Sequence, residues 1–249
     1  DMMAIKTAIR RAFPYLPVST QAQEAARHSR EAFWASVFNN TVAKSSWMKK
    51  ISLSPSGWAA GYQYLYVMYR VLNDKRPKHI LDIGLGQSSL LIAQYAAANP
   101  SVEHVIVESS DEWIADFTRS HRLPANSRIV KLDYAMADFP GASAPVRVYS
   151  GFREALKGLE FDFVSIDAPW SGDMAEFARV DMLGLVGSGL ARSYVMLFDD
   201  TNRRAELATL ARLQERLAAE GYTASSAPYY GRNTCHVIVS DDNAFVKTM

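Results

Sequence analysis

The chain has 249 residues, a length that allows one large domain or two small ones. Hydrophobic residues make up 49% of the sequence and charged residues 21%, so we expect a globular protein rather than a disordered, collagen-like or disulfide-stapled one. Lys and Arg together number 27 and Asp and Glu 26, and this balance gives no electrostatic reason to expect nucleic acid or an anionic membrane as a partner.

The first part of the chain predicts a helical extension. Between residues 22 and 37, apolar side chains recur at spacings of three, four and seven, which is the period of a helix. A second helix is predicted over residues 58–72, where aromatic and leucine side chains form one face that we interpret as core packing. We therefore expect residues 1–76 to form an N-terminal helical cap and residues 77–249 to form the main domain.

From His79 onward, short apolar strands alternate with helices. Parallel strands need crossover connections, and helices supply them, so five such units predict a mostly parallel sheet covered on both faces. The predicted strands are residues 79–84, 104–108, 146–149, 161–167 and 193–199, and the helices that follow them are residues 88–98, 112–120, 152–159, 174–185 and 204–220.

Two further segments complete the predicted sheet. R-I-V-K-L, starting at Arg128, indicates an extra strand, and T-C-H-V-I-V-S, starting at Thr234, indicates a last strand at the sheet edge, antiparallel and without a following helix. The predicted fold class is therefore α/β: a doubly wound, mostly parallel, seven-stranded Rossmann-like sheet with an antiparallel last strand and an N-terminal helical extension.

The sequence also bears on the compartment. The longest uncharged hydrophobic stretch, near residues 62–69, is far shorter than the ~20 residues that span a bilayer, so no transmembrane helix is expected. Lys6, Arg10 and Arg11 interrupt the first residues, so no cleaved signal peptide is expected. The single cysteine, Cys235, cannot form an intrachain disulfide, which favours a reducing, cytoplasmic location.

Ligands of open parallel sheets bind beyond the carboxyl ends of the strands, so the residues that close each strand are the candidate site. Glycines after the first strand allow a sharp turn and a close approach to a ligand, and an acid at the end of the second strand is placed to accept ribose hydroxyls. A lone G-x-G also occurs in ordinary strand-to-helix turns. The candidates are Asp82, Gly84, Gly86, Glu108, Ser150, Gly151, Asp167, Asp199 and Asp200.

The residues around the glycines indicate which nucleoside is bound. The dinucleotide pattern continues to a third Gly or Ala, but this chain has Ser89 there, which disfavours pyrophosphate. Asp82 would repel an anionic phosphate and attract a cationic ligand. The sequence therefore predicts a nucleoside that carries positive charge.

D-I-G-L-G-Q-S-S and I-V-E-S resemble the cofactor motif of class I S-adenosylmethionine (SAM)-dependent methyltransferases, over residues 77–239. The resemblance implies that the two glycines line the methionine and ribose parts of SAM, that the acid holds the ribose hydroxyls, and that residues 150–152 lie near adenine. The implied cofactor-binding residues are Asp82, Gly84, Gly86, Ser88, Glu108, Ser150, Gly151, Phe152 and Asp167.

A finer resemblance comes from Y-S-G-F, F-D-F-V-S-I-D-A-P-W, R-V-D-M-L and F-D-D-T-N-R, which are similar to the glucuronoxylan and polysaccharide O-methyltransferase group and its bacterial relatives. That group usually has I-D-G-P where this chain has I-D-A-P, so Ala168 replaces a glycine in the loop over the cofactor. The resemblance implies transfer of a methyl group to a hydroxyl of a sugar, a polysaccharide or a small molecule.

Asp167, Asp199 and Asp200 end adjacent predicted strands and are the candidate catalytic residues. Carboxylates that share a cleft raise one another's pKa, and a divalent cation (Mg²⁺, Mn²⁺ or Co²⁺) with oxygen ligands removes the conflict. The arrangement is similar to that of metal-dependent O-methyltransferases, in which the ion orients the acceptor hydroxyl and lowers its pKa. The alternative is that Asp167 contacts the sulfonium, Asp199 caps the following helix and Asp200 pairs with Arg203.

The acceptor side is less defined by the sequence. Catechol-type enzymes have a lysine three residues after the first metal-binding acid, whereas this chain has Trp170, so the general base is open, with Asp173 and His236 as candidates. Trp170, Arg179 and Arg203 are the candidate substrate-binding residues, although each arginine also fits a surface or helix-end charge.

Two other classes of function are considered. A noncatalytic SAM-binding or assembly subunit could keep the fold, and turnover would separate it from an enzyme. A nucleic-acid methyltransferase is disfavoured by the balanced charge and by the absence of an N/D-P-P-Y/F motif after the fourth strand. The sequence specifies neither the acceptor nor the oligomeric state.

Overall fold

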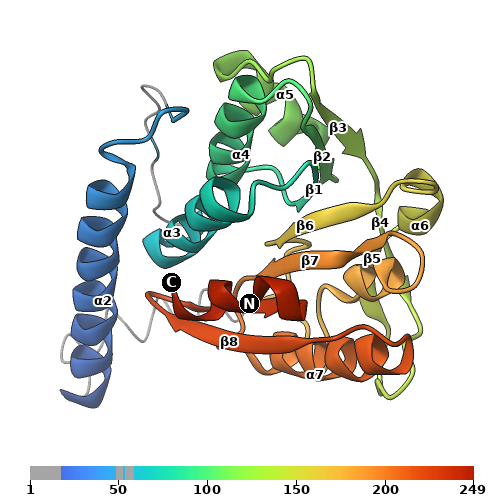
Figure 1. Ribbon diagram of the computed structural model, residues 1–249. Helices are drawn as coiled ribbons and strands as arrows, with labels where there is room; N and C mark the ends of the chain where they lie inside the picture. Colours follow the sequence, from blue (N-terminus) through green and yellow to red (C-terminus); the bar gives the residue numbers. More distant parts are fainter. Residues whose placement is uncertain (1–17, 49–52, 54–58) are drawn as a thin grey trace.

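The structure is a computed structural model that describes residues 18–48, 53 and 59–249. Its centre is a seven-stranded sheet in the order β3-β2-β1-β6-β7-β9-β8 (Figure 1). The first five of these strands run parallel, β9 is antiparallel to β7, and β8 is antiparallel to β9. The strands are β1 (His79–Ile83), β2 (Glu103–Glu108), β3 (Ser127–Lys131), β6 (Phe161–Ile166), β7 (Leu190–Phe198), β8 (Ser225–Tyr230) and β9 (Thr234–Val239). The predicted fold class is confirmed.

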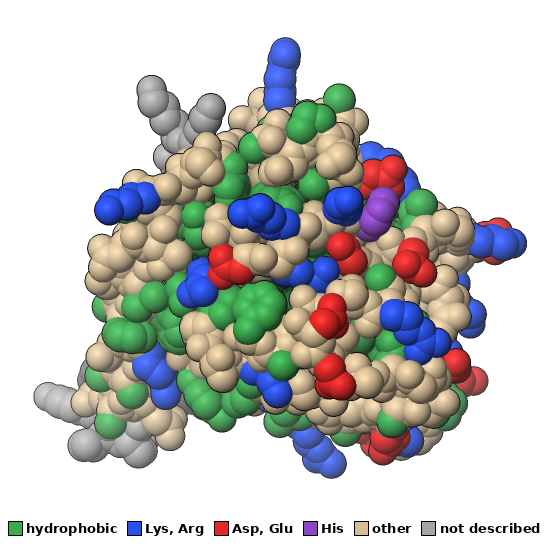
Figure 2. Space-filling model, viewed as in Figure 1, with side chains coloured by type: hydrophobic (Ala, Val, Ile, Leu, Met, Phe, Trp, Pro, Cys, Tyr) green, Lys and Arg blue, Asp and Glu red, His purple; other side chains and the backbone are tan. Residues whose placement is uncertain are grey.

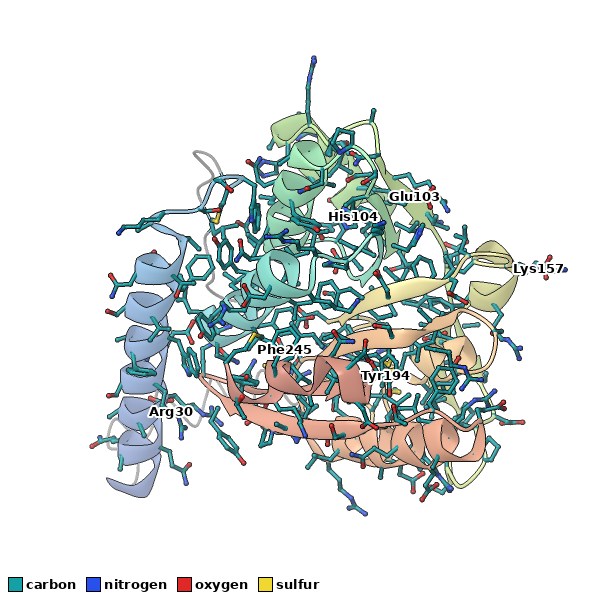
Figure 3. The ribbon with its side chains drawn as sticks, in the orientation of Figure 1. Arg30, Glu103, His104, Lys157, Tyr194 and Phe245 are labelled. Carbon is teal, nitrogen blue, oxygen red and sulfur yellow. The ribbon has the colours of Figure 1, made fainter. Side chains whose placement is uncertain are left out.

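Alternating apolar side chains on the strands fill both faces of the sheet, and side chains occupy the space between strands and helices (Figure 3). On β1, Ile80 packs into the core of one face, whereas Leu81 and Ile83 pack into the core of the other. One face is covered by α3 (Tyr62–Arg70), α4 (Gln87–Ala98), α5 (Asp111–Ser120) and η3 (Asp241–Thr248), and the other by α6 (Phe152–Ala155), η2 (Val180–Leu185) and α7 (Arg204–Ala219).

The helical extension consists of α2 (Val18–Val42), α3 and the π-helix η1 (Val71–Lys75). Trp34 and Phe38 of α2 face the body of the protein, and the Trp34 ring lies 5.2 Å from the ring of Tyr66 on α3. Phe33, which belongs to the predicted apolar repeat, is instead 60% exposed. Trp58, the first residue of the second predicted helix, lies outside the described residues.

The strand predicted at residues 146–149 is not part of the main sheet. It forms β5 (Val146–Tyr149), which pairs antiparallel with β4 (Tyr134–Ala137) in a separate two-stranded sheet. The prediction that residues 146–159 form one of the five parallel strand-helix units is wrong. The reason is burial: β5 fully buries only its two end residues, too little apolar surface for a strand covered on both faces, whereas β6 buries five of its six residues.

Three other predicted elements differ from the structure. The helix predicted at 174–185 is only η2, because Arg179 adopts a left-handed conformation (φ 58°) that ends any helix before it. The helix predicted at 152–159 is the four-residue α6. The last predicted strand, β9, is internal, because β8 forms the edge of the sheet. The sequence did not indicate β8, because it contains Pro228, a residue that is unusual in strands. Proline is tolerated in an edge strand, where its missing N–H is not needed for pairing.

The surface agrees with the balanced composition. On the face shown in Figure 2, Lys and Arg side chains are interspersed with Asp and Glu, and hydrophobic side chains gather towards the side where α2 lies. In the part of the chain that the structure describes, no helix combines the length and the hydropathy that a membrane crossing requires.

Candidate functional site

A cavity of about 540 Å³ opens at the carboxyl ends of β1, β2, β6 and β7. The segment before α3 and the turn between β8 and β9 complete its wall. Ten of the sequence-predicted site residues line it together: Gly84, Gly86, Ser88, Glu108, Asp167, Trp170, Arg179, Asp199, Asp200 and Arg203. Residues that are far apart in the sequence therefore converge on one cavity, as expected for the carboxyl edge of a parallel sheet.

The loop between β1 and α4 needs glycine at position 84. Gly84 has φ 113°, and a Cβ there would lie 2.9 Å from the Cβ of Ala168. Ala168, the residue that replaces glycine in the I-D-A-P motif, thus packs directly against this loop. The Gly86 N–H donates to Ser89 Oγ at 3.0 Å, which fixes the start of α4.

Glu108 ties this loop to the end of β2. Its Oε2 accepts the Leu85 N–H at 3.2 Å, and its Oε1 accepts the N–H groups of Ser109 and Ser110 at 2.6 and 2.9 Å. The side chain is almost fully buried, yet the residue lines the cavity. The backbone donors orient the carboxylate, and Oε2 keeps acceptor capacity for a ligand hydroxyl.

Asp82 lies below the cavity rather than in its wall. It is fully buried, and its carboxylate accepts hydrogen bonds from Ser89 Oγ at 2.5 Å and from Ser165 Oγ at 2.7 Å. The Tyr64 hydroxyl of α3 continues this network to Ser165 Oγ at 2.9 Å. Asp82 thus holds the glycine loop from underneath, and its predicted contact with a ligand stays a prediction.

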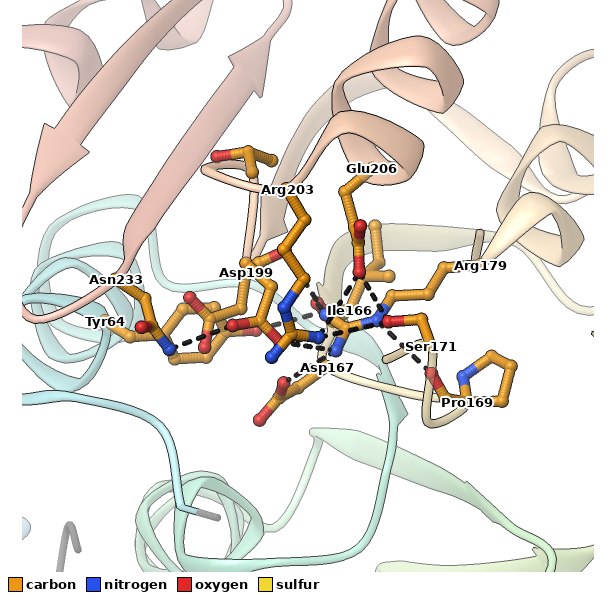
Figure 4. Close-up of polar contacts among 12 residues, drawn as sticks. Tyr64, Ile166, Asp167, Pro169, Ser171, Arg179, Asp199, Arg203, Glu206 and Asn233 are labelled. Atoms are coloured by element: carbon orange, nitrogen blue, oxygen red, sulfur yellow. Dashed lines mark hydrogen bonds and ion pairs between the residues drawn. The ribbon is translucent and has the colours of Figure 1, made fainter. Parts of the chain in front are cut away.

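Three carboxylates and two guanidinium groups form a cluster at the other end of the cavity (Figure 4). Carboxylate oxygens of Asp167, Asp199 and Asp200 lie within 4.8 Å of one another. Arg179 reaches them from the loop before η2, and Arg203 from the start of α7. Five charged side chains thus share one small volume.

Arg179 is the centre of this cluster. It is 3% exposed, and its Nη2 lies 2.8 Å from Asp200 Oδ2 and 3.3 Å from Asp167 Oδ1. Its Nη1 donates to the backbone carbonyls of Ile166 at 3.4 Å and Asp199 at 3.2 Å. These contacts make Arg179 a fixed internal cation, and they bind it to the protein rather than leaving it extended towards an acceptor.

Asp200 is fully engaged by its neighbours. It adopts a left-handed conformation (φ 60°), and besides Arg179 its Oδ2 contacts Arg203 Nη1 at 3.0 Å. Its Oδ1 accepts a hydrogen bond from Asn233 Nδ2 at 2.9 Å. The sequence-based alternative in which Asp200 pairs with Arg203 agrees with this ion pair.

The pKa values of Asp167 and Asp199 show that the neighbouring arginines only partly offset the effect of burying these carboxyl groups. Burial raises the pKa of Asp167 to about 7, against the opposing effect of the Arg179 guanidinium. Burial, followed by the charges of Asp167 and Asp200, raises the pKa of Asp199 well above its ordinary value. Asp199 Oδ1 is buried and has no hydrogen-bond partner, so this oxygen has unused acceptor capacity.

These observations test whether a divalent cation fits. The spacing and chemistry of the donors suit a hard cation, and the unpartnered Asp199 Oδ1 is a free ligand atom. Both oxygens of Asp200 already accept hydrogen bonds or ion pairs. The residues therefore fit a cation held by Asp167 and Asp199, with Asp200 as their neighbour rather than as a third free ligand.

Several sequence-predicted candidates lie outside the cavity. Gly151 and Phe152 line a separate hollow beside β5 and η2, and Ser150 follows β5 in the hairpin sheet, not in the main sheet. Asp173 forms a bidentate pair with Arg147, which lowers the pKa of Asp173. His236 Nδ1 lies 2.7 Å from Thr201 Oγ1, and burial lowers the pKa of His236. Neither candidate base borders the cavity.

The structure adds cavity residues that the sequence analysis missed. Trp113 of α5 and Tyr134 of β4 line the cavity and are 45% and 41% exposed. The Trp113 Nε1–H donates to the Leu85 carbonyl at 2.7 Å, beside Glu108. Its position five residues after the acid at the end of β2 is a sequence signal that could have indicated it. Tyr134 had no such signal, because the hairpin was not predicted.

The solved structures that resemble this one include methyltransferases. The structure is similar to an SAH-bound methyltransferase from Podospora anserina, with a TM-score of 0.51 and 17% sequence identity over 92% of this chain and 99% of that chain. It is also similar to the O-methyltransferase TomG from Streptomyces achromogenes, involved in tomaymycin synthesis and solved in complex with SAM, with a TM-score of 0.52 and 15% identity over 84% of this chain and 98% of that chain. No family model matches the sequence, and no curated protein is significantly similar to it. At these identities the likeness establishes the Rossmann-like fold.

Proposed function

We propose that the protein is a SAM-dependent O-methyltransferase that acts on a hydroxyl of a sugar, a polysaccharide or a small molecule. One observation carries the proposal: a single cavity has a nucleoside-type end, with the glycine loop and Glu108, and a carboxylate end, with Asp167 and Asp199. The fold shared with SAM- and SAH-bound methyltransferases supports it.

At the nucleoside end, the backbone and Glu108 bind the cofactor. Gly84 and Gly86 let the loop approach the methionine and ribose parts, and Glu108 Oε2 accepts a ribose hydroxyl. Trp113 and Ser88 border the same part of the cavity. The sulfonium then lies towards the carboxylate end, where Asp167 and Asp199 line the cavity.

The reaction is an in-line displacement at the methyl carbon. A lone pair of the acceptor oxygen forms the new C–O bond as the C–S bond breaks, the electron pair goes to sulfur, and the hydroxyl proton is released. Cavity walls that hold the acceptor and the sulfonium in line supply most of the rate increase. We propose that the carboxyl group of Asp199, which lines the cavity and whose buried Oδ1 has no hydrogen-bond partner, accepts that proton or holds a cation.

We propose that a divalent cation (Mg²⁺, Mn²⁺ or Co²⁺) is held by Asp167 and Asp199. When bound, the ion would polarise the acceptor hydroxyl and lower its pKa. Arg179 and Arg203 hold Asp200 in either case and reduce the repulsion between the carboxylates. Trp170, 50% exposed in the cavity wall, and Arg203, whose side chain is 37% exposed, are the proposed acceptor-facing residues.

The test is a search for methyl transfer. The protein is incubated with SAM and a panel of oligosaccharides, methyl glycosides and phenolic compounds, and products are analysed for the mass increase of one methyl group together with SAH release. An Asp199→Asn variant is the control, because it keeps the shape of the side chain but removes the group that could take up a proton or bind a cation. SAM binding without transfer to any panel compound would favour the noncatalytic SAM-binding alternative.

A further inference from the structure

Two segments that are far apart in the sequence form the wall of the cavity at the end away from Glu108. Ala59 and Ala60 precede α3, and Arg232 and Asn233 belong to the turn between β8 and β9. Asn233 Nδ2 donates to Asp200 Oδ1 at 2.9 Å, and Arg232 Nη2 donates to the Ala59 carbonyl at 2.8 Å, so both segments lie on the side of the carboxylate cluster. They border the space that the acceptor occupies in the proposed reaction.

Gln63 of α3 joins the two segments. It is fully buried, and its Nε2 donates to the backbone carbonyl of Asn233 at 3.1 Å. A Cβ at Gly231 would lie 2.2 Å from Gln63 Oε1, and a Cβ at Gly61 would lie 2.4 Å from the same atom. The amide therefore fits only because both neighbouring segments carry glycine at the point of contact.

The contact continues from the turn to the carboxylate cluster. The residue whose carbonyl Gln63 holds, Asn233, donates from its own Nδ2 to Asp200 Oδ1 at 2.9 Å. Asp200 in turn contacts Arg179 and Arg203. Gln63 is thus two hydrogen bonds away from a carboxylate of the cluster without touching the cavity itself.

Helix α2 braces the same two segments from outside. Glu31 Oε1 accepts the N–H of Tyr62, the first residue of α3, at 2.9 Å. The Trp34 Nε1–H donates to the carbonyl of Tyr230, at the end of β8, at 2.7 Å. Helix α2 therefore holds both the start of α3 and the end of β8, the two segments between which Gln63 is packed.

We propose that Gln63 is a positioning residue of the acceptor site: through Asn233 it sets the orientation of Asp200, and together with the Arg232–Ala59 hydrogen bond it sets the spacing of the two walls. The proposal rests on the proposed function, since it concerns the acceptor of the methyl transfer. Gln63 borders neither Glu108 nor the glycine loop, which hold most of the cofactor in the proposed function, so its removal should affect the acceptor far more than the binding of SAM.

The first test needs no acceptor. The variant Gln63→Met keeps the length of the side chain and removes the amide, and the side-chain amide resonance of Asn233 is followed by NMR, assigned with Asn233→Ala. We expect this resonance to shift in Gln63→Met. Tyr194→Phe is the matched control: it removes one hydroxyl bond, to the Thr223 carbonyl at 3.1 Å, from a buried side chain outside the cavity wall, and it leaves the resonance in place. An unshifted resonance in folded Gln63→Met overturns the proposal.

The second test uses the panel acceptor with the highest turnover. In Gln63→Met we expect kcat/KM for the acceptor to fall about tenfold, the scale of a lost positioning bond, and the Kd for SAM to stay within about twofold. In the double variant with Asn233→Ala, Gln63→Met should cost less than it does in the wild type, because the part of its effect that passes through the Asn233 side chain is already lost. Wild-type acceptor kinetics, or additive losses, refute the proposal.

The failure modes are distinct. If SAM neither binds nor reacts, the proposed function fails; if SAM reacts but Gln63→Met leaves acceptor kinetics unchanged, only the role of Gln63 fails. If Gln63→Met does not fold, Asn233→Ala, a turn substitution, takes over the kinetic test: it must raise the acceptor KM without changing the Kd for SAM, and unchanged kinetics overturn the proposal.

Discussion

Replacing Glu108 by Gln tests the nucleoside end of the cavity most directly. Glu108 Oε1 already accepts two backbone N–H groups, so Oε2, which accepts only Leu85 N–H among the backbone donors, is the atom with capacity for a ribose hydroxyl. In Glu108→Gln the side-chain carbonyl keeps the Oε1 bonds, and an NH₂ group replaces Oε2. The ligand loses a hydrogen bond to a charged group, which contributes about 1.5–3 kcal/mol.

This loss corresponds to a Kd for SAM or SAH that rises about 10- to 150-fold. Isothermal titration calorimetry with SAH measures it, and thermal unfolding checks that the fold survives the loss of the Leu85 bond, which costs about 1–2 kcal/mol. Glu112→Gln is the matched control, since it removes an exposed acid in the first turn of α5, close to the same loop. A Kd within twofold of wild type in folded Glu108→Gln would place the ribose site elsewhere.

SAM and SAH should bind and NAD should not, because of Asp82, Glu108 and the absence of the third Gly or Ala of the dinucleotide pattern; calorimetric binding of NAD alone would contradict this. Chelation should lower methyl transfer and leave the Kd for SAM unchanged, with Mg²⁺, Mn²⁺ or Co²⁺ restoring activity; full turnover in excess chelator, with no bound metal by elemental analysis, would contradict a cation held by Asp167 and Asp199. Burial raises the pKa of Asp181 to about 7, so Asp181 loses its proton at a lower pH in the unfolded chain than in the folded protein. The free energy of unfolding should therefore fall by up to about 4 kcal/mol between about pH 4 and pH 7. In urea titrations Asp181→Asn should flatten this part of the pH profile, and an unchanged slope would refute the role of Asp181. Tyr64→Phe removes a fully buried hydroxyl that accepts the Ile166 N–H at 3.2 Å, and it should lower the free energy of unfolding by about 1–3 kcal/mol. A variant as stable as the wild type would show that the hydrogen-bond network under the cavity contributes little to stability.

Local sequence signals determined the fold class and half of the site. The period of the apolar residues marked β1, β2, β6 and β7, and because parallel strands end at one edge, the acids and glycines that follow them were expected to meet. Glu108, Asp167 and Asp199 accordingly border one cavity. These inferences depend only on neighbours in the chain and on the geometry that every parallel sheet shares.

Tertiary structure alone decided the partners of these groups. That Arg179 is buried among the carboxylates depends on a left-handed turn after β6, and that Asp82 supports the loop from below depends on Ser165, a residue of another strand. The pairing of β5 with β4 and the wedge of Gln63 between two glycines likewise arise from contacts across long sequence separations. Such contacts are selected by packing, burial and hydrogen bonding of the whole chain, and these quantities have no local period in the sequence.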